Sequence, residues 1–356
     1  MRFGVIGLGN ATAMFHRPAL GRVAGAEVAG GFDPAPEQRA AWERDTGSPA
    51  YADLDELFER ARPEVVVIAT PPDSHVELCL RAVAAGCHVF CEKPLTETVA
   101  DTDRVLAAAA AAGRRVAVNL EFREHPIFRA VRDGVASGGH GRLAFCQLWQ
   151  LMDLPPWAEP TAWRARMANR ALLEGGIHLV DLLLAIYGEE PTAVTARLSA
   201  GLHEQSDADA VQLVTVEFPG GRLGQITIDR ICPAGMRYLE VRADCEQASL
   251  RASFGGRATL RVGLKRAEKP GAQLELGRAG LAWAERGASR STLARNPADA
   301  GIVGTTRLLE GLIRAIERDE EPPSSAREAR TVLAVIEAAY ESARTGARVA
   351  VTRAPA

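Results

Sequence analysis

Short apolar runs alternate with helical patterns through the first third of the chain. Five runs are apolar almost throughout: RFGVIG, EVAGGF, EVVVIAT, HVFCE and RVAVNL. Helical patterns such as DSHVELCLRAVAAG separate them, and Gly86 and Gly113 lie where helices are expected to end. Asp53 with Glu56 is typical of a helix start. Apolar strands separated by helices predict a doubly wound α/β domain with a parallel sheet over residues 1–120.

The pattern changes after residue 120. An amphipathic stretch near residues 126–135 is followed by longer β-rich segments, among them RLAFCQLWQL, AVQLVTVEF and RLGQITIDR. Several of these segments alternate apolar and polar residues, which suits an antiparallel sheet with two unlike faces. One helical pattern, GGIHLVDLLLAIYG, interrupts them and two more close the chain. We therefore expect a second domain over residues 121–356, with α/β character and a large, mostly antiparallel sheet.

Composition narrows the class of protein. The chain has 356 residues, enough for two domains, and its 47% hydrophobic and 24% charged content is near globular norms. The net charge of −3 gives no basic field that would indicate nucleic acid or a membrane surface. The sequence contains no apolar run long enough for a membrane span, and its start lacks a signal-peptide pattern. These features favour a cytoplasmic enzyme.

The spacing of the cysteines and histidines does not indicate a metal site. The six cysteines include no Cys-x-x-Cys pair, and we interpret them as reduced structural thiols. The seven histidines include no His-x-His or His-Glu-x-x-His pattern. The sequence therefore predicts no metal site.

Part of a nucleotide-binding signature opens the chain in VIGLGNATAMF. Gly7 and Gly9 have the first two spacings of Gly-x-Gly-x-x-Gly, and Thr12 stands where the third glycine is usual. In a strand-to-helix turn, the first glycine permits the tight turn and the second lets the backbone approach a pyrophosphate. Asn10 and Ala11 complete the expected binding turn. Thr12 is small enough to replace the glycine with a modest shift.

Asp33 is the second feature that indicates a dinucleotide. It ends EVAGGFD about 20 residues past the glycines, the usual distance for the acid that binds a ribose diol. Its carboxylate would repel a 2′-phosphate, and Pro34 rather than an arginine follows, so the pattern favours NAD over NADP. The alternative is an ordinary strand-to-helix turn with an acid at the strand end and no nucleotide.

Two further stretches carry candidate catalytic residues. Lys93, in HVFCEKPL, follows the fourth of the apolar runs and should emerge at the carboxyl edge of the parallel sheet, where ligands bind. In ALLEGGIHLVDLLLAIYG, Ile177, Val180, Leu184 and Tyr187 form an apolar stripe, which leaves His178 and Asp181 on another face. We expect His178 in the first turn of this helix, where the dipole favours a neutral imidazole. Glu174 lies four residues earlier, within side-chain reach on a helix.

These residues suit the oxidation of a secondary alcohol. His178 is the natural base for the hydroxyl proton, and the Lys93 cation would stabilise the developing alkoxide. Glu174 could orient the pair or couple to its charge. The alternatives are a satisfied polar histidine, a surface lysine and an acid that only stabilises a helix start.

Glu-Lys-Pro combined with the His-x-x-Asp helix resembles the glucose–fructose oxidoreductase/inositol dehydrogenase (Gfo/Idh/MocA) family. The resemblance covers nearly the whole chain. It includes GVIGLGNATAMFHRPAL, ATPPDSHVELCLRAVAAGCHVFCEKPL, the Trp163-Arg164 pair and the closing AAYESARTGARVAV. It implies a Rossmann domain followed by an α/β domain with a large, mostly antiparallel sheet.

The resemblance also implies roles for single residues. Lys93 matches the lysine that hydrogen-bonds the reacting oxygen, and His178 matches the histidine that exchanges a proton with it. Glu174 occupies a position where many members carry Asp, and its extra methylene moves the carboxylate by more than a bond length. His16 also matches a family position, where it could simply cap or pack. The resemblance places a further set near the cofactor or the active-site mouth: Thr70, Pro71, His75, Glu92, Asn119, Trp163 and Arg164.

The leading hypothesis is an NAD-dependent dehydrogenase or reductase that acts on a sugar, an inositol or a related polyol. A glycosidase that uses bound NAD for transient oxidation is one alternative. A non-catalytic NAD-sensing protein is another. We expect a small-molecule substrate and a homo-oligomer, a dimer or a tetramer, since relatives associate through the broad antiparallel sheet.

Overall fold

The computed structural model describes residues 1–152, 171–199, 209–232, 238–255, 257–262, 272–277 and 280–353. The chain forms two compact units. The first consists of Met1–Glu124, Gly301–Glu337 and Thr352–Ala356, and the second of His125–Ala300 and Ala338–Val351. The first boundary lies near the expected one. Residues 301–337, however, return to the first unit, which differs from the expectation that 121–356 forms one domain.

The first unit contains a six-stranded sheet in which every pairing is parallel. Its order is β3-β2-β1-β4-β5-β6, so the direction of winding reverses between β1 and β4. This is the doubly wound Rossmann order, and it confirms the predicted α/β class. The strands are β1 (Arg2–Ile6), β2 (Glu27–Phe32), β3 (Ala50–Tyr51), β4 (Val65–Ile68), β5 (His88–Cys91) and β6 (Val116–Val118).

Helices connect these strands. Asp53 accepts a hydrogen bond from the Asp55 backbone N–H at 2.7 Å and so caps α3 as predicted. Gly86 and Gly113 have φ values of 82° and 63° just past α4 and α5, where helices were expected to end. The helices are α1 (Arg17–Leu20), α2 (Pro36–Thr46), α3 (Leu54–Glu56), α4 (His75–Ala84), α5 (Val99–Ala112) and α9 (Ala300–Arg318), with shorter turns η1 (Thr12–His16), η2 (Leu57–Ala61), η3 (Pro72–Ser74) and η4 (Glu121–Glu124).

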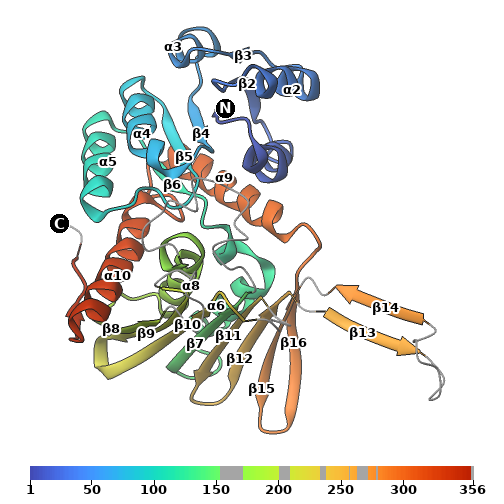
Figure 1. The fold of residues 1–356 in the computed structure, drawn as a ribbon, viewed down its shortest axis with the longest axis vertical. Coiled ribbons are helices and arrows are strands. Elements are labelled where there is room, and N and C mark those ends of the chain that lie inside the picture. Colours follow the sequence, from blue (N-terminus) through green and yellow to red (C-terminus); the bar gives the residue numbers. More distant parts are fainter. Residues whose placement is uncertain are drawn as a thin grey trace. The chain divides into compact units, whose positions relative to one another are not determined.

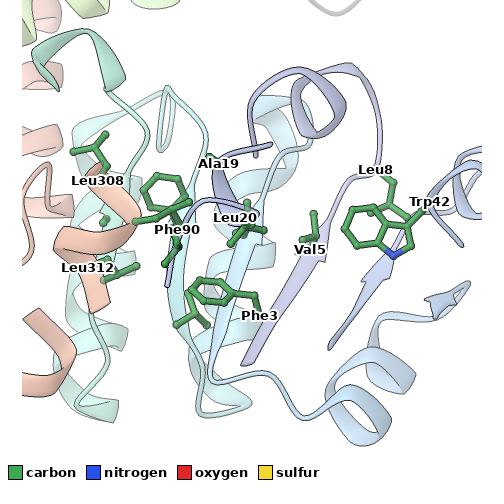
Figure 2. Close-up of a cluster of buried hydrophobic side chains, with 14 residues drawn as sticks. Phe3, Val5, Leu8, Ala19, Leu20, Trp42, Phe90, Leu308 and Leu312 are labelled. Carbon is green, nitrogen blue, oxygen red and sulfur yellow. The ribbon is translucent and has the colours of Figure 1, made fainter. Parts of the chain in front are cut away.

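A buried apolar cluster explains why the late segment belongs to the first unit. Phe3, Phe90 and their strand neighbours pack with Leu308, Leu309 and Leu312 of α9, all of them 0% exposed (Figure 2). Burial of each of these leucines stabilises the folded state by roughly 2 kcal/mol. The segment therefore covers a sheet whose strands all come from the first third of the chain.

The second unit contains a nine-stranded sheet in the order β16-β15-β12-β11-β7-β10-β9-β8-β17. Every pairing is antiparallel except the parallel pair of β7 and β10, which confirms the expected architecture. The strands are β7 (Leu143–Leu151), β8 (Ala193–Ser199), β9 (Val211–Phe218), β10 (Arg222–Asp229), β11 (Leu239–Cys245), β12 (Ser249–Phe254), β15 (Leu281–Arg286), β16 (Ser289–Arg295) and β17 (Val349–Ala350). A separate antiparallel pair, β13 (Arg257–Val262) and β14 (Ala272–Gly277), stands apart from this sheet in Figure 1.

Helices α6 (Pro126–Ala136) and α8 (Ile177–Tyr187) pack against this sheet. The helical turn η6 (Ala171–Gly176) leads directly into α8, and η7 (Pro219–Gly221) joins β9 to β10. Nearly every side chain of α8 is buried, including His178 and Asp181. The face of α8 that carries His178 and Asp181 is therefore buried as well as the apolar stripe, because protein surrounds nearly all of this helix. The second part of α10 (Ala326–Thr345) completes this unit.

Across the described ranges, no helix combines the length and the apolar character that crossing a bilayer would require.

Candidate active site

A cavity of about 420 Å³ lies in the first unit, where the winding of the parallel sheet reverses. Its walls come from the turns that follow β1, β2 and β4, together with η3 and the start of α4. Ligands of doubly wound sheets bind in this crevice. The lining residues are Gly7, Gly9, Phe32, Asp33, Pro34, Ala69, Thr70, Pro71, Asp73, Ser74 and Leu78.

The two glycines of the turn are needed for different reasons. Gly7 has a φ of 87°, and a Cβ on it would lie 2.8 Å from the carbonyl oxygen of Ala69. A Cβ on Gly9 would meet no described atom within 4 Å, although Gly9 lines the cavity. The fold itself thus requires Gly7, whereas the missing side chain of Gly9 leaves room in the cavity. That division fits a dinucleotide whose pyrophosphate approaches the second glycine.

Thr12 closes the turn from the position of the usual third glycine. Its side chain is 1% exposed, and its hydroxyl donates to the carbonyl oxygen of Gly7 at 2.5 Å. The replacement therefore keeps the turn compact and leaves no unpaired hydroxyl. Asn10 and Ala11 begin the helical stretch beside the cavity, but they are not among its lining residues.

Asp33 is held rigidly at the wall of the cavity. Its Oδ2 accepts from the backbone N–H of Leu8 at 2.8 Å, and its Oδ1 accepts from that of Ala35 at 2.9 Å. Each carboxylate oxygen keeps a further lone pair for a ribose hydroxyl. Arg39 donates to the carbonyl oxygens of Asp33 and Pro34, both at 2.8 Å. Arg39 could not be identified from the sequence, because it lies within α2 rather than beside the motif.

After β4, two residues line the cavity and a nearby histidine holds their turn in place. Thr70 and Pro71 line it, and the Thr70 hydroxyl lies 2.7 Å from the Ser74 hydroxyl. His75 is 0% exposed, with Nδ1 2.8 Å from the carbonyl oxygen of Pro94 and Nε2 2.9 Å from that of Thr70. Burial lowers the pKa of His75. His75, expected near the cofactor or the active-site mouth, is not among the lining residues, and its imidazole joins the turn that carries Thr70 to the turn that carries Pro94.

Glu92 is the centre of a hydrogen-bond network rather than a cavity residue. Its Oε1 lies 2.8 Å from His16 Nε2 and accepts from Asn119 Nδ2 at 2.8 Å, while Oε2 accepts from the Lys93 backbone N–H at 3.1 Å. Burial opposes ionisation, but the bond and charge of His16, the Asn119 amide and the Lys93 charge lower the pKa of Glu92 to about 2. Glu92 and Asn119 therefore fix the turn that carries Lys93, which is partly buried after the carboxyl end of β5.

In the second unit, Glu174 and His178 lie four residues apart on one continuous helical stretch. His178 is the second residue of α8, but η6 precedes it by a full turn. His178 is therefore not in the first turn of the helical segment, and the expected effect of a helix start on it does not hold as stated. Trp163 and Arg164 lie outside the described residues.

The Gly175-Gly176 pair brings η6 onto the sheet. A Cβ on Gly176 would lie 2.5 Å from Cδ1 of Ile228, so no larger residue fits there. The close approach places Glu174 Oε2 3.5 Å from Nη1 of Arg230, directly after β10. Sequence reasoning did not identify Arg230, because a single arginine at a strand end belongs to no motif.

Comparison with known proteins agrees with this architecture. Residues 1–120 match the family model of an oxidoreductase family with an NAD-binding Rossmann fold, and residues 128–251 match the GFO/IDH/MocA C-terminal domain. A 1,5-anhydro-D-fructose reductase from Ensifer adhaerens is 29% identical over 63% of this chain and 68% of its own length. An inositol 2-dehydrogenase from Saccharopolyspora erythraea is 30% identical over 72% and 74%, respectively.

The fold also recurs in solved structures. An oxidoreductase from Agrobacterium radiobacter, in complex with NAD+, L-tartaric acid and magnesium, superposes with a TM-score of 0.81. It is 19% identical and covers 99% of this chain and 98% of its own. The chain belongs to the Gfo/Idh/MocA family of oxidoreductases, and its first 120 residues form the NAD-binding Rossmann domain of that family.

Proposed function

We propose that this protein is an NAD-dependent oxidoreductase that transfers a hydride between nicotinamide and a secondary alcohol or ketone of a sugar, an inositol or a related polyol. The observation that carries the proposal is the cavity beside Gly9 and Asp33, within the same unit as Lys93. Relatives named as a sugar reductase and an inositol dehydrogenase support this substrate class.

The residues of the cavity fit NAD better than NADP. The Gly7–Gly9 turn would hold the pyrophosphate, and Thr70 and Pro71 would lie against the dinucleotide. The Asp33 carboxylate would accept the ribose hydroxyls and repel a 2′-phosphate. Arg39 is engaged by two backbone carbonyls, so it does not offset that repulsion. Bound NAD would supply the hydride acceptor for the carbinol carbon, and NADH would supply the hydride for the reverse direction.

We assign the proton chemistry to three residues. His178 takes the hydroxyl proton during oxidation and returns it during reduction. The Lys93 ammonium donates a hydrogen bond to the reacting oxygen and stabilises its negative charge. Glu174 contributes a carboxylate near this proton system, and the Glu92 network keeps Lys93 in its turn.

A turnover screen tests the proposal. Purified protein with NAD is offered polyols such as myo-inositol and D-glucitol, and reduced nicotinamide is followed by absorbance; ketoses with NADH test the reverse direction. Lys93→Met and His178→Asn serve as inactive controls. A protein that binds NADH but turns over no polyol or ketose in either direction contradicts the proposal. Cleavage of a glycoside without net formation of NADH would instead support the glycosidase alternative. The NAD-sensing alternative would be supported if the protein binds NAD and Lys93→Met leaves its biological effect unchanged.

We further propose a cytoplasmic homo-oligomer that associates through the nine-stranded sheet. Leu213 on β9 and Leu223 on β10 are 49% and 42% exposed, on the face opposite the buried residues of these strands. These two leucines would be covered if this face of the sheet formed the subunit interface. Light scattering of the purified protein measures the number of subunits, and a monomer would contradict this assignment.

A further inference from the structure

Two completely buried polar side chains lie beside Glu174 in the second unit. Gln150 ends the buried row of β7, and Arg230 directly follows β10. The two strands are parallel neighbours, with Gln150 opposite Ile228 and Leu151 opposite Asp229. Gln150 is 0% and Arg230 1% exposed, so both belong to the row of residues that faces α8. The sheet thus brings an amide and a guanidinium to one end of its covered face.

Neither side chain is satisfied within the described part of the chain. Nε, Nη1 and Nη2 of Arg230 and both amide atoms of Gln150 are buried without a hydrogen-bond partner there. Glu174 Oε2 approaches Nη1 of Arg230 at 3.5 Å, which makes an ion pair but leaves Nε and Nη2 without an acceptor. A buried cation whose donors are unpaired is costly, and native proteins rarely keep one without a purpose.

The chemistry of this group defines what would complete it. A guanidinium is a donor only, and the Gln150 amide adds two N–H donors and a single acceptor oxygen. The group therefore lacks acceptors rather than donors. A hydroxyl brings a donor with each acceptor, whereas a carboxylate brings two acceptor oxygens and no donor. The Nε–Nη2 edge of an arginine also matches both oxygens of a carboxylate at once.

Gly175 of η6 lies against this polar group. A Cβ on Gly175 would lie 3.5 Å from Gln150 Oε1 and 3.6 Å from Arg230 Nη1, so a larger side chain at this position would pack onto both polar atoms. The Glu174 side chain is 12% exposed and marks the point where the group reaches the surface. Glu174 Oε2 approaches Arg230 at Nη1, whereas Nε and Nη2 on the opposite edge have no hydrogen-bond partner among the described residues.

We propose that Arg230 and Gln150 bind a carboxylate of the substrate, so that the enzyme acts on an acidic polyol, a sugar acid, in preference to its neutral counterpart. This inference rests on the proposed function, since it names the class of polyol that the same active site accepts. It makes Arg230 a specificity-determining residue.

Matched pairs of ligands test the proposal by binding, without any need for turnover. Calorimetric titration of the NAD-saturated protein compares D-gluconate with D-glucitol and D-glucuronate with D-glucose. At least one acid should bind tenfold or more tightly than its neutral partner, and Arg230→Met should remove that difference. Arg222→Met, at the other end of β10, should preserve it, because Arg222 pairs with Glu189. If no acid binds more tightly than its partner, or if Arg230→Met keeps the preference, the proposal is overturned.

A second variant tests the proposal independently if Arg230→Met does not fold. Gln150→Glu supplies the missing acceptor inside the protein, with almost no change in shape. It should raise the melting temperature and abolish the preference for acids. A lower melting temperature with the preference intact contradicts the proposal. Failure of the proposed function looks different, because the protein would then turn over no polyol or ketose, whereas the binding comparison of acids with neutral partners needs no turnover.

Discussion

Nε2 of His16 lies 2.8 Å from Oε1 of Glu92, and this contact joins the helix after the glycine turn to the residue before Lys93. His16 is 0% exposed, so the contact is shielded from solvent. The same Glu92 oxygen accepts from Asn119. Two parts of the Rossmann domain that would hold the cofactor and the reacting oxygen are therefore fixed to one carboxylate.

The Glu92 network predicts a loss of stability in acid. The pKa of Glu92 is lowered from 4.5 to about 2, so its carboxylate stabilises the folded state above pH 4.5. That contribution, about 3 kcal/mol at most, is lost as the pH falls from 4.5 towards 2. Urea unfolding should show Glu92→Gln less stable than the wild type at pH 7, with the gap closing as the pH approaches 3. A gap that is independent of pH would contradict this role.

Gly7 and Gly9 should respond differently to alanine. Gly7→Ala places a Cβ against Ala69 at a φ of 87°, and we expect it to destabilise the fold by about 1–3 kcal/mol. Gly9→Ala meets no described atom and should leave the melting temperature unchanged. It should nevertheless weaken NADH binding tenfold or more, because the new methyl group occupies space beside the pyrophosphate. Equal NADH affinity in Gly9→Ala and the wild type would remove the turn from the cofactor site.

His178→Asn should lower turnover by about 10²-fold or more, the usual scale for a lost general base. NADH affinity should stay within a few-fold of the wild type, because the NAD-binding residues belong to the other unit. His140→Asn, in the same unit as His178 and assigned no role, is the matched control. Turnover by His178→Asn within a few-fold of the control would exclude His178 as the base.

The order of strands and helices could be predicted where burial follows the pattern of the sequence. Apolar runs and cap residues such as Asp53 predicted the parallel sheet, and alternation predicted the antiparallel one. The return of residues 301–337 to the first unit could not be predicted in this way. The apolar stripe of α9 indicates that one face of the helix is buried, but not which sheet it packs against. The same limit applies to α8, because the sequence pattern does not indicate that the face with His178 and Asp181 is buried too.

Within the candidate site, motif residues were predictable and their partners were not. Gly7, Gly9, Asp33, Thr70 and Pro71 meet at one cavity, as their positions after parallel strands indicated. His75, Glu92 and Asn119 were expected near the cofactor or the active-site mouth, and the hydrogen bonds by which they hold the surrounding turns could not be predicted from the motifs. Arg230 and Gln150 come together only through strand register, which depends on the tertiary structure.

The most direct test of the account is cofactor binding. Purified protein is titrated separately with NADH and NADPH while nicotinamide fluorescence is followed, and Asp33→Ala is titrated in the same way. We predict tight binding of NADH, weak binding of NADPH, and a loss of that preference in Asp33→Ala because the carboxylate that repels a 2′-phosphate is gone. Binding of neither nucleotide, or tighter binding of NADPH by the wild type, would contradict it.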